Sequence, residues 1–199
     1  MTMRLTTFLL LLICSNSFAQ TSSYQNLLNT ALKGHGSLFI YAKPIEVTQL
    51  KPKELWYYFQ NSIAFSNQTL DTVMFSQIIQ NAKSADTTLW SDSELPKFIL
   101  INETSEMVSK NYVIQKLNLT NKKEIKSYTK YINNFNSAVV SDRVICYYSR
   151  PVFDNSKNFA IVQWNNGPIY HSGGGGIILY QLQNDNTWKE FATVLSSRY

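Results

Sequence analysis

The sequence contains few of the residues that form disulfide bonds in small secreted domains or bind metals. It has two cysteines and two histidines in 199 residues. Cys14 lies in the apolar N-terminal stretch, so the rest of the chain keeps one thiol, Cys146. A single thiol makes no internal disulfide, and no group of cysteines, histidines or acids has the spacing of a zinc or calcium site. We therefore expect no disulfide framework, no bound metal and no cofactor.

Charge is also sparse. Charged residues make up 16% of the chain, and the formal net charge is +5. No basic run with interleaved aromatic residues marks a nucleic-acid groove, so we expect no nucleic-acid partner. The lysines are scattered, apart from Lys51 with Lys53 and the group Lys122, Lys123 and Lys126. A cationic helix face that touches anionic glycans or lipid is one interpretation of that group, and a solvated face is the interpretation we favour.

Long apolar runs are missing after residue 19. Before it, Met1–Thr7 carries Arg4 and no acid, Phe8–Ile13 is unbroken apolar sequence, and Ser17-Phe18-Ala19 places small residues before a cleavage point. This pattern predicts a signal peptide over residues 1–19, cut after Ala19, whose apolar run is too short to span a bilayer. Ile13 precedes Cys14, where lipoprotein signals carry a small residue, which disfavours a lipid anchor.

Residues 20–199 are expected to form one α+β domain with no transmembrane segment, periplasmic or secreted. The most regular part of the chain is its last third, where runs rich in β-branched and aromatic residues alternate with turn residues. These runs predict an antiparallel sheet of about four or more strands. The expected strands are Arg143–Ser149, Phe159–Trp164, Ile177–Leu182 and Trp188–Val194.

The front of the chain predicts helices that cover this sheet. Apolar residues at helical spacing, with polar capping residues, indicate helices over Ser22–Lys33, Asp71–Lys83 and Asn121–Phe135. Helix Asn121–Phe135 is expected to pack on the sheet. The aromatic stretch Glu54–Phe59 favours helix only weakly. Short β-rich runs predict further strands at Leu38–Tyr41, Phe98–Ile101 and Tyr112–Leu117.

Four consecutive glycines, Gly173–Gly176, are the most conspicuous local feature. Backbone amides of such a run can cradle a phosphate or carboxylate. Phosphate loops, however, lead into a helix and usually carry Lys and Ser or Thr, whereas this run leads into a predicted strand. We therefore interpret Asn165–Gly176 as a hairpin loop whose glycines adopt positive φ or form a bulge.

Candidate functional residues gather around the same loop. We expect a contact surface formed by Trp164, Asn166, Tyr170, His171, Gly174 and Gly175, because loops on a rigid sheet commonly carry binding residues. A thiol–imidazole pair of Cys146 with His171 or His35 is a weaker alternative. Cys146 alternates with apolar neighbours in mid-strand, which is typical of a buried structural cysteine.

The C-terminal quarter resembles a group of small exported bacterial proteins without an assigned function. The residues that carry the resemblance are Ser149-Arg150-Pro151-Val152-Phe153-Asp154, Phe159–Val162, the Gly173–Gly176 run, Ile178-Leu179-Tyr180 and Trp188-Lys189. Many relatives carry two cysteines in the loop, where this chain has Tyr170-His171-Ser172, which removes a disulfide or metal reading of the loop. The resemblance implies export and an α+β fold, and it assigns no catalytic residue.

Two functional hypotheses remain. The favoured one is a non-enzymatic binding module whose partner is a protein or small ligand in the cell envelope or outside. The alternative is an envelope hydrolase with a site near the Asn165–Gly176 loop. No G-x-S-x-G nucleophile motif is present, while a pair of carboxylates assembled in space would leave no sequence spacing.

Overall fold

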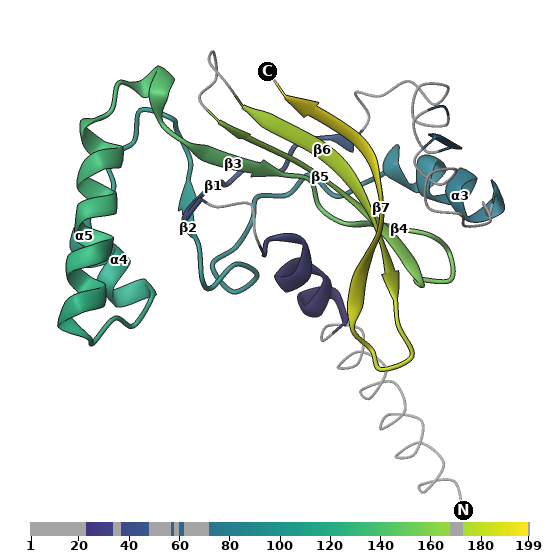
Figure 1. Cartoon of the computed structure of the whole chain (residues 1–199), viewed down its shortest axis with the longest axis horizontal. Helices are drawn as coiled ribbons and strands as arrows, with labels where there is room; N and C mark the ends of the chain where they lie inside the picture. Colours follow the sequence, from purple (N-terminus) through teal and green to yellow (C-terminus); the bar gives the residue numbers. More distant parts are fainter. Residues whose placement is uncertain are drawn as a thin grey trace, which may run out of the picture.

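A mixed seven-stranded sheet forms the centre of the computed structural model (Figure 1). The structure describes residues 23–33, 37–47, 57, 60–61, 72–167 and 173–198. The strands run in the order β2-β1-β3-β5-β6-β7, and β4 pairs with β5 beside β3. Their bounds are β1 Phe39–Tyr41, β2 Ile99–Ile101, β3 Ile145–Tyr148, β4 Val152–Phe153, β5 Phe159–Gly167, β6 Gly174–Leu182 and β7 Trp188–Arg198.

The C-terminal strands form the predicted antiparallel meander. Strand β5 pairs with β3 and β6, and β6 pairs with β7, all antiparallel. The turns between them lie where Asn and Asp residues predict them, with Lys157 and Asn186 both at φ 59°. The two short front strands β1 and β2 run parallel to each other, and β1 is parallel to β3. The α+β class is therefore confirmed, with a parallel extension at one end of the sheet.

Helices cover both faces of the sheet. Helix 23–31 buries its predicted apolar stripe against one face, together with Trp90 and Leu95. On the opposite face, helix α3 (Thr72–Ala82) covers the β4–β7 region. The same face carries helices α4 (Lys110–Lys116) and α5 (Lys122–Ser137) at the β2-β1-β3 end. Figure 1 shows α4 and α5 together at one end of the molecule and α3 at the other.

Helix α5 is predicted well by the sequence. Asn121 caps it, because the side chain accepts a hydrogen bond from the backbone N–H of Lys123 at 2.8 Å. Ile132 and Phe135 are its fully buried side chains, and Phe135 packs on Phe39 of β1 with ring centroids 3.9 Å apart. The helix packs on the sheet as expected, but over its parallel end rather than over the C-terminal hairpins.

The expected strand Tyr112–Leu117 is wrong, because this segment belongs to α4. Ser109 caps the helix by accepting a hydrogen bond from the N–H of Tyr112, and Val113 is its one buried residue. The β-branched pair Val113-Ile114 suggested a strand. A segment with one buried side chain, Val113, also suits a short helix that packs along one side only. The weak helix prediction at Glu54–Phe59 lies mostly outside the described residues, and the signal peptide lies wholly outside them.

The glycine run is part of a strand and not of a loop. Gly174–Gly176 begin β6 and pair with Asn166, Asn165 and Trp164 of β5. A Cβ on Gly175 would clash with Oδ1 of Asn165 and would lie 3.1 Å from the carbonyl oxygen of Trp164. Glycine is therefore required at position 175 because the Asn165 side chain lies too close for a Cβ atom, and not because the backbone has a positive φ. The two ends of the expected loop Asn165–Gly176 therefore belong to strands, residues 165–167 to β5 and residues 174–176 to β6.

Replacing Gly175 by alanine should lower the free energy of unfolding by about 1–3 kcal/mol, because the added methyl group overpacks this position. The same substitution in an Asn165→Ala background should cost clearly less, since the side chain that it meets is gone. Urea denaturation of the wild type, both single variants and the double variant measures the coupling. Equal costs of Gly175→Ala in the two backgrounds would contradict the close approach.

Candidate functional site

The predicted contact surface is only partly brought together. Trp164 is half-buried and packs against the core on the face that carries helix 23–31. The side chain of Asn166 accepts a hydrogen bond from the N–H of Gly174 at 2.9 Å, so it stabilises the hairpin. Tyr170 and His171 lie outside the described residues. The described members of this group therefore hold β5 and β6 together.

Cys146 is a buried structural residue, as its sequence context predicts. Its exposed fraction is 1%, and it lies between β1 and β5 in the middle of the sheet. Burial raises the pKa of its thiol, which disfavours the reactive thiolate. Both histidines of the chain, His35 and His171, lie outside the described residues. In the described part of the chain, no cluster of three His, Cys, Asp or Glu side chains could hold a metal ion.

Arg150 forms the most extensive polar network that the structure describes. The guanidinium is 9% exposed, lies 4.5 Å from the centre of the Trp90 ring, and pairs with Glu94. It also donates hydrogen bonds to the hydroxyl of Tyr24 at 3.1 Å and to the carbonyl oxygen of Leu89 at 3.1 Å. A buried cation needs such partners, and here the protein itself supplies them. The network ties helix 23–31 and segment 86–94 to the sheet.

The carboxylate of Glu94 makes part of this network pH-dependent. Partial burial acts to raise its pKa, but hydrogen bonds from Arg150 and Ser91 outweigh burial and hold the pKa below its ordinary value of 4.5. A depressed carboxyl pKa stabilises the fold above the unfolded value, and that stabilisation disappears as the pH falls through the folded value. The network is therefore complete at neutral pH and weakens in acid.

An open groove lies where the chain enters β1 and β2, between the end of helix 23–31 and α5. It has a volume of about 380 Å³, within the usual range for small-molecule sites. Its walls are mainly apolar and aromatic, formed by Leu32, Leu38, Phe98, Tyr128 and Tyr131. The groove is open to solvent, and the side chain of Tyr131 in its wall is 38% exposed.

The polar groups of the groove are few and well placed. Tyr131 stacks on Phe39 with ring centroids 5.4 Å apart, and its hydroxyl lies 3.4 Å from the hydroxyl of buried Ser37. Ser37 in turn donates to the carbonyl oxygen of Val144 at 3.0 Å. The aromatic wall is thus held in place before any ligand arrives. Among the described residues, Lys97 and Ser127 complete the lining, which holds this one cation and no carboxylate.

Sequence reasoning missed this groove. Tyr128 belongs to the helix predicted over Asn121–Phe135, but nothing in the sequence indicates that Phe98 and Tyr131, 33 residues apart, line the same groove. Arg150 had a signal, since an arginine between an apolar strand and Pro151 is costly unless it is paired.

No protein-family model, curated protein or solved structure matches this chain. The resemblance of the C-terminal quarter to small exported proteins therefore stays a prediction. The groove and the surfaces of the molecule are therefore the features that bear on its function.

Glu94→Gln should lower the free energy of unfolding at neutral pH, because the ion pair with buried Arg150 is lost. Wild-type stability should decline as the pH is lowered from about 5, whereas the variant should respond less over the same range. Thermal unfolding followed by circular dichroism between neutral pH and pH 3 measures both curves. Glu190→Gln, which removes an exposed carboxylate on β7, serves as the control. Parallel curves for wild type and Glu94→Gln would contradict the assignment.

Proposed function

We propose that the chain is an exported, non-enzymatic binding protein whose groove beside α5 takes a small amphipathic anion. The observation that carries this proposal is the groove itself, an open, largely aromatic groove of about 380 Å³ with a lysine in its lining. Ligand pockets combine such apolar walls with a few polar groups that orient the ligand. No observation in the described residues favours the hydrolase alternative.

The chemistry of the lining selects the class of ligand. Phe98, Tyr128 and Tyr131 offer flat apolar surface to an aromatic or aliphatic body. The ammonium of Lys97 favours a carboxylate, sulfonate or phosphate at one end. On α5, Lys123 and Lys130 lie four residues before and three residues after Ser127, so they flank this wall of the groove. The charge of the rim therefore complements an anion.

An anionic aromatic probe, 8-anilino-1-naphthalenesulfonate, should bind the native chain at one site with increased fluorescence. Ser127→Tyr should weaken this binding by about tenfold or more, because the new ring fills the groove. Lys97→Glu should weaken it as well, since the rim then repels the sulfonate. Fluorescence titration measures each affinity.

Asn133→Tyr is the matched control for the groove, because it adds the same side chain to another exposed position of α5. It should leave probe binding unchanged. If Asn133→Tyr and Ser127→Tyr weaken binding equally, or if neither does, the groove is not the binding site.

Export is proposed from the N-terminal pattern of Arg4, an apolar run and small residues before Gln20. Mass spectrometry of the protein isolated from its native host should then find an N-terminus at Gln20. An intact Met1 or a lipidated Cys14 would contradict the proposal of a cleaved, soluble exported form.

A further inference from the structure

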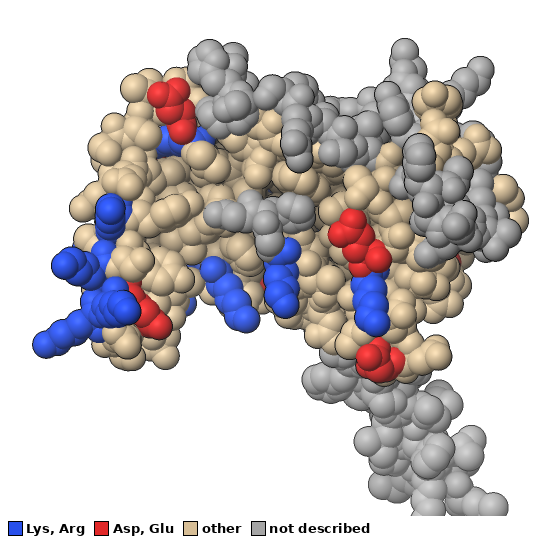
Figure 2. Space-filling view, viewed as in Figure 1, with Lys and Arg blue, Asp and Glu red and all other residues tan. Residues whose placement is uncertain are grey.

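The positive charge of the chain is concentrated in one short part of the fold. Residues 110–137, which comprise α4 and α5, contain six lysines and one acid, Glu124. Their net charge of +5 equals the formal net charge of all 199 residues, so the rest of the chain is neutral on balance. Figure 2 shows the densest group of blue side chains at the α4–α5 end of the molecule, with further blue side chains spaced along the lower part of the same face.

The geometry of α5 arranges most of these lysines as one surface. Lys122, Lys126 and Lys130 follow one another at intervals of four residues, so they line one side of the helix. All three are exposed. The buried side chains of this helix, Ile132 and Phe135, anchor it to the sheet. Of the lysines in this segment, Lys116 is engaged with Asp92.

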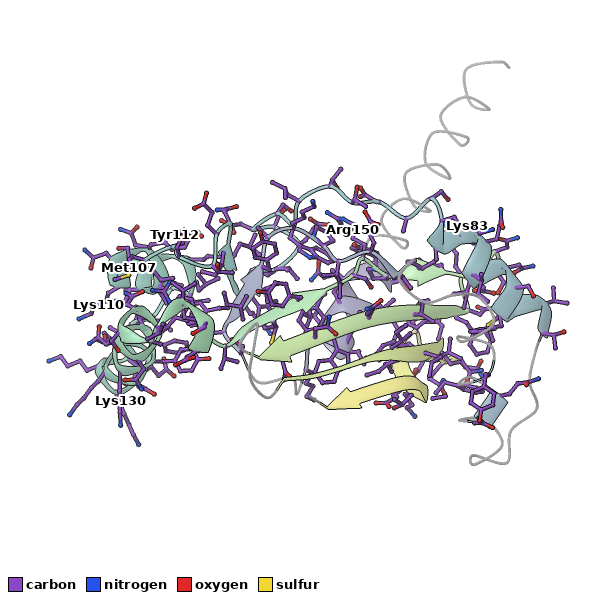
Figure 3. The ribbon with its side chains drawn as sticks, turned by 90° about the horizontal axis from the view of Figure 1, so that it is seen from above. Lys83, Met107, Lys110, Tyr112, Lys130 and Arg150 are labelled. Carbon is purple, nitrogen blue, oxygen red and sulfur yellow. The ribbon has the colours of Figure 1, made fainter. Side chains whose placement is uncertain are left out.

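Exposed apolar side chains occur at the same end of the molecule. The structure describes nine large exposed apolar side chains, and six of them lie between residues 107 and 144. They are Met107, Tyr112, Tyr131, Val139, Val140 and Val144. Figure 3 shows Met107, Lys110 and Lys130 at one end of the molecule, and Lys83 at the opposite end.

We infer that the α4–α5 end docks the protein onto an anionic phospholipid surface. Lysines attract negatively charged headgroups, while tyrosine, methionine and valine side chains enter the boundary between headgroups and acyl chains. An anionic polymer would use the lysines but would have no use for the exposed apolar side chains at this end of the molecule. The described helices include none that is long and apolar enough to cross a bilayer, so this contact is peripheral. Lys122, Lys126 and the side chains of α4 lie outside the groove, while Lys130 also flanks it and Tyr131 also lines it. The docking itself needs no ligand in the groove.

Co-sedimentation with lipid vesicles tests this docking surface with the full chain. Binding to vesicles of phosphatidylglycerol and phosphatidylcholine should exceed binding to pure phosphatidylcholine, and it should fall as salt is added. The triple variant Lys122→Gln, Lys126→Gln and Lys130→Gln should lose affinity of the order of 100-fold, given roughly fivefold for each lysine near such a surface.

A second triple variant removes the same charge elsewhere. Lys43→Gln, Lys83→Gln and Lys189→Gln change exposed lysines outside α4 and α5. This variant should bind the vesicles like the wild type, and any contribution of the rest of the chain cancels in the comparison. Equal losses in the two triple variants would mean that only the net charge matters, which would overturn the proposal. Unchanged binding in the first triple variant would overturn it as well.

The apolar side chains distinguish a lipid surface from an anionic polymer. Met107→Ser combined with Tyr112→Ser should weaken vesicle binding and leave the binding of polyphosphate unchanged. If this double variant binds vesicles like the wild type, or if the wild type prefers polyphosphate to vesicles, the inferred lipid surface is wrong. The ligand of the α4–α5 end would then be a polyanion. Circular dichroism melting of each variant confirms that the fold is intact, which is expected because all substituted side chains are exposed.

Discussion

The structure depends on strands β5 and β6 being buried on both faces. Ala160 and Val162 pack against the cluster that contains helix 23–31, while Ile161, between them, packs against the cluster that contains α3. A sheet whose central strands are apolar on both sides needs two covering layers. The chain supplies both from its front half. The distant segments 23–31 and 72–82 therefore pack on opposite faces of the C-terminal meander.

Arg150 links helix 23–31 and the 86–94 segment, which cover one face of the sheet, to the sheet itself. A guanidinium that is 9% exposed needs to be paired with charge and hydrogen-bond acceptors. Its partners Tyr24, Asp86 and Glu94 come from the covering segments, whereas Arg150 itself directly follows the meander strand β3. One buried cation thereby joins helix 23–31 and the 86–94 segment to the sheet. The position of helix 23–31 and the 86–94 segment on the sheet is therefore determined by polar pairing as well as by apolar packing.

The sequence predicted those features that depend on local residues. The cap at Asn121, turn residues between the C-terminal strands and the strands β3, β5, β6 and β7 were expected, whereas the two-residue strand β4 was not. The strand predicted at Tyr112–Leu117 was wrong, because its three apolar residues fit either period and the segment packs against α5 as a helix. The groove could not be predicted, since Phe98 and Tyr131 line it together only once α5 packs on β1 and β1 pairs with β2. Neither segment carries a local sign of these long-range contacts.

Helix α5 is peripheral, and this position explains why both proposed sites involve it. Only Ile132 and Phe135 are fully buried, and they rest on strands of three or four residues at the end of the sheet. The rest of the helix surface is free to vary without disturbing the doubly covered strands β5 and β6. Tyr128 and Tyr131 line the groove on one side, and the lysines occupy the exposed side. Tyr128 and Tyr131 therefore point in a different direction from Lys122 and Lys126, whereas Lys130 borders both proposed sites, so the two proposals share one helix and one lysine.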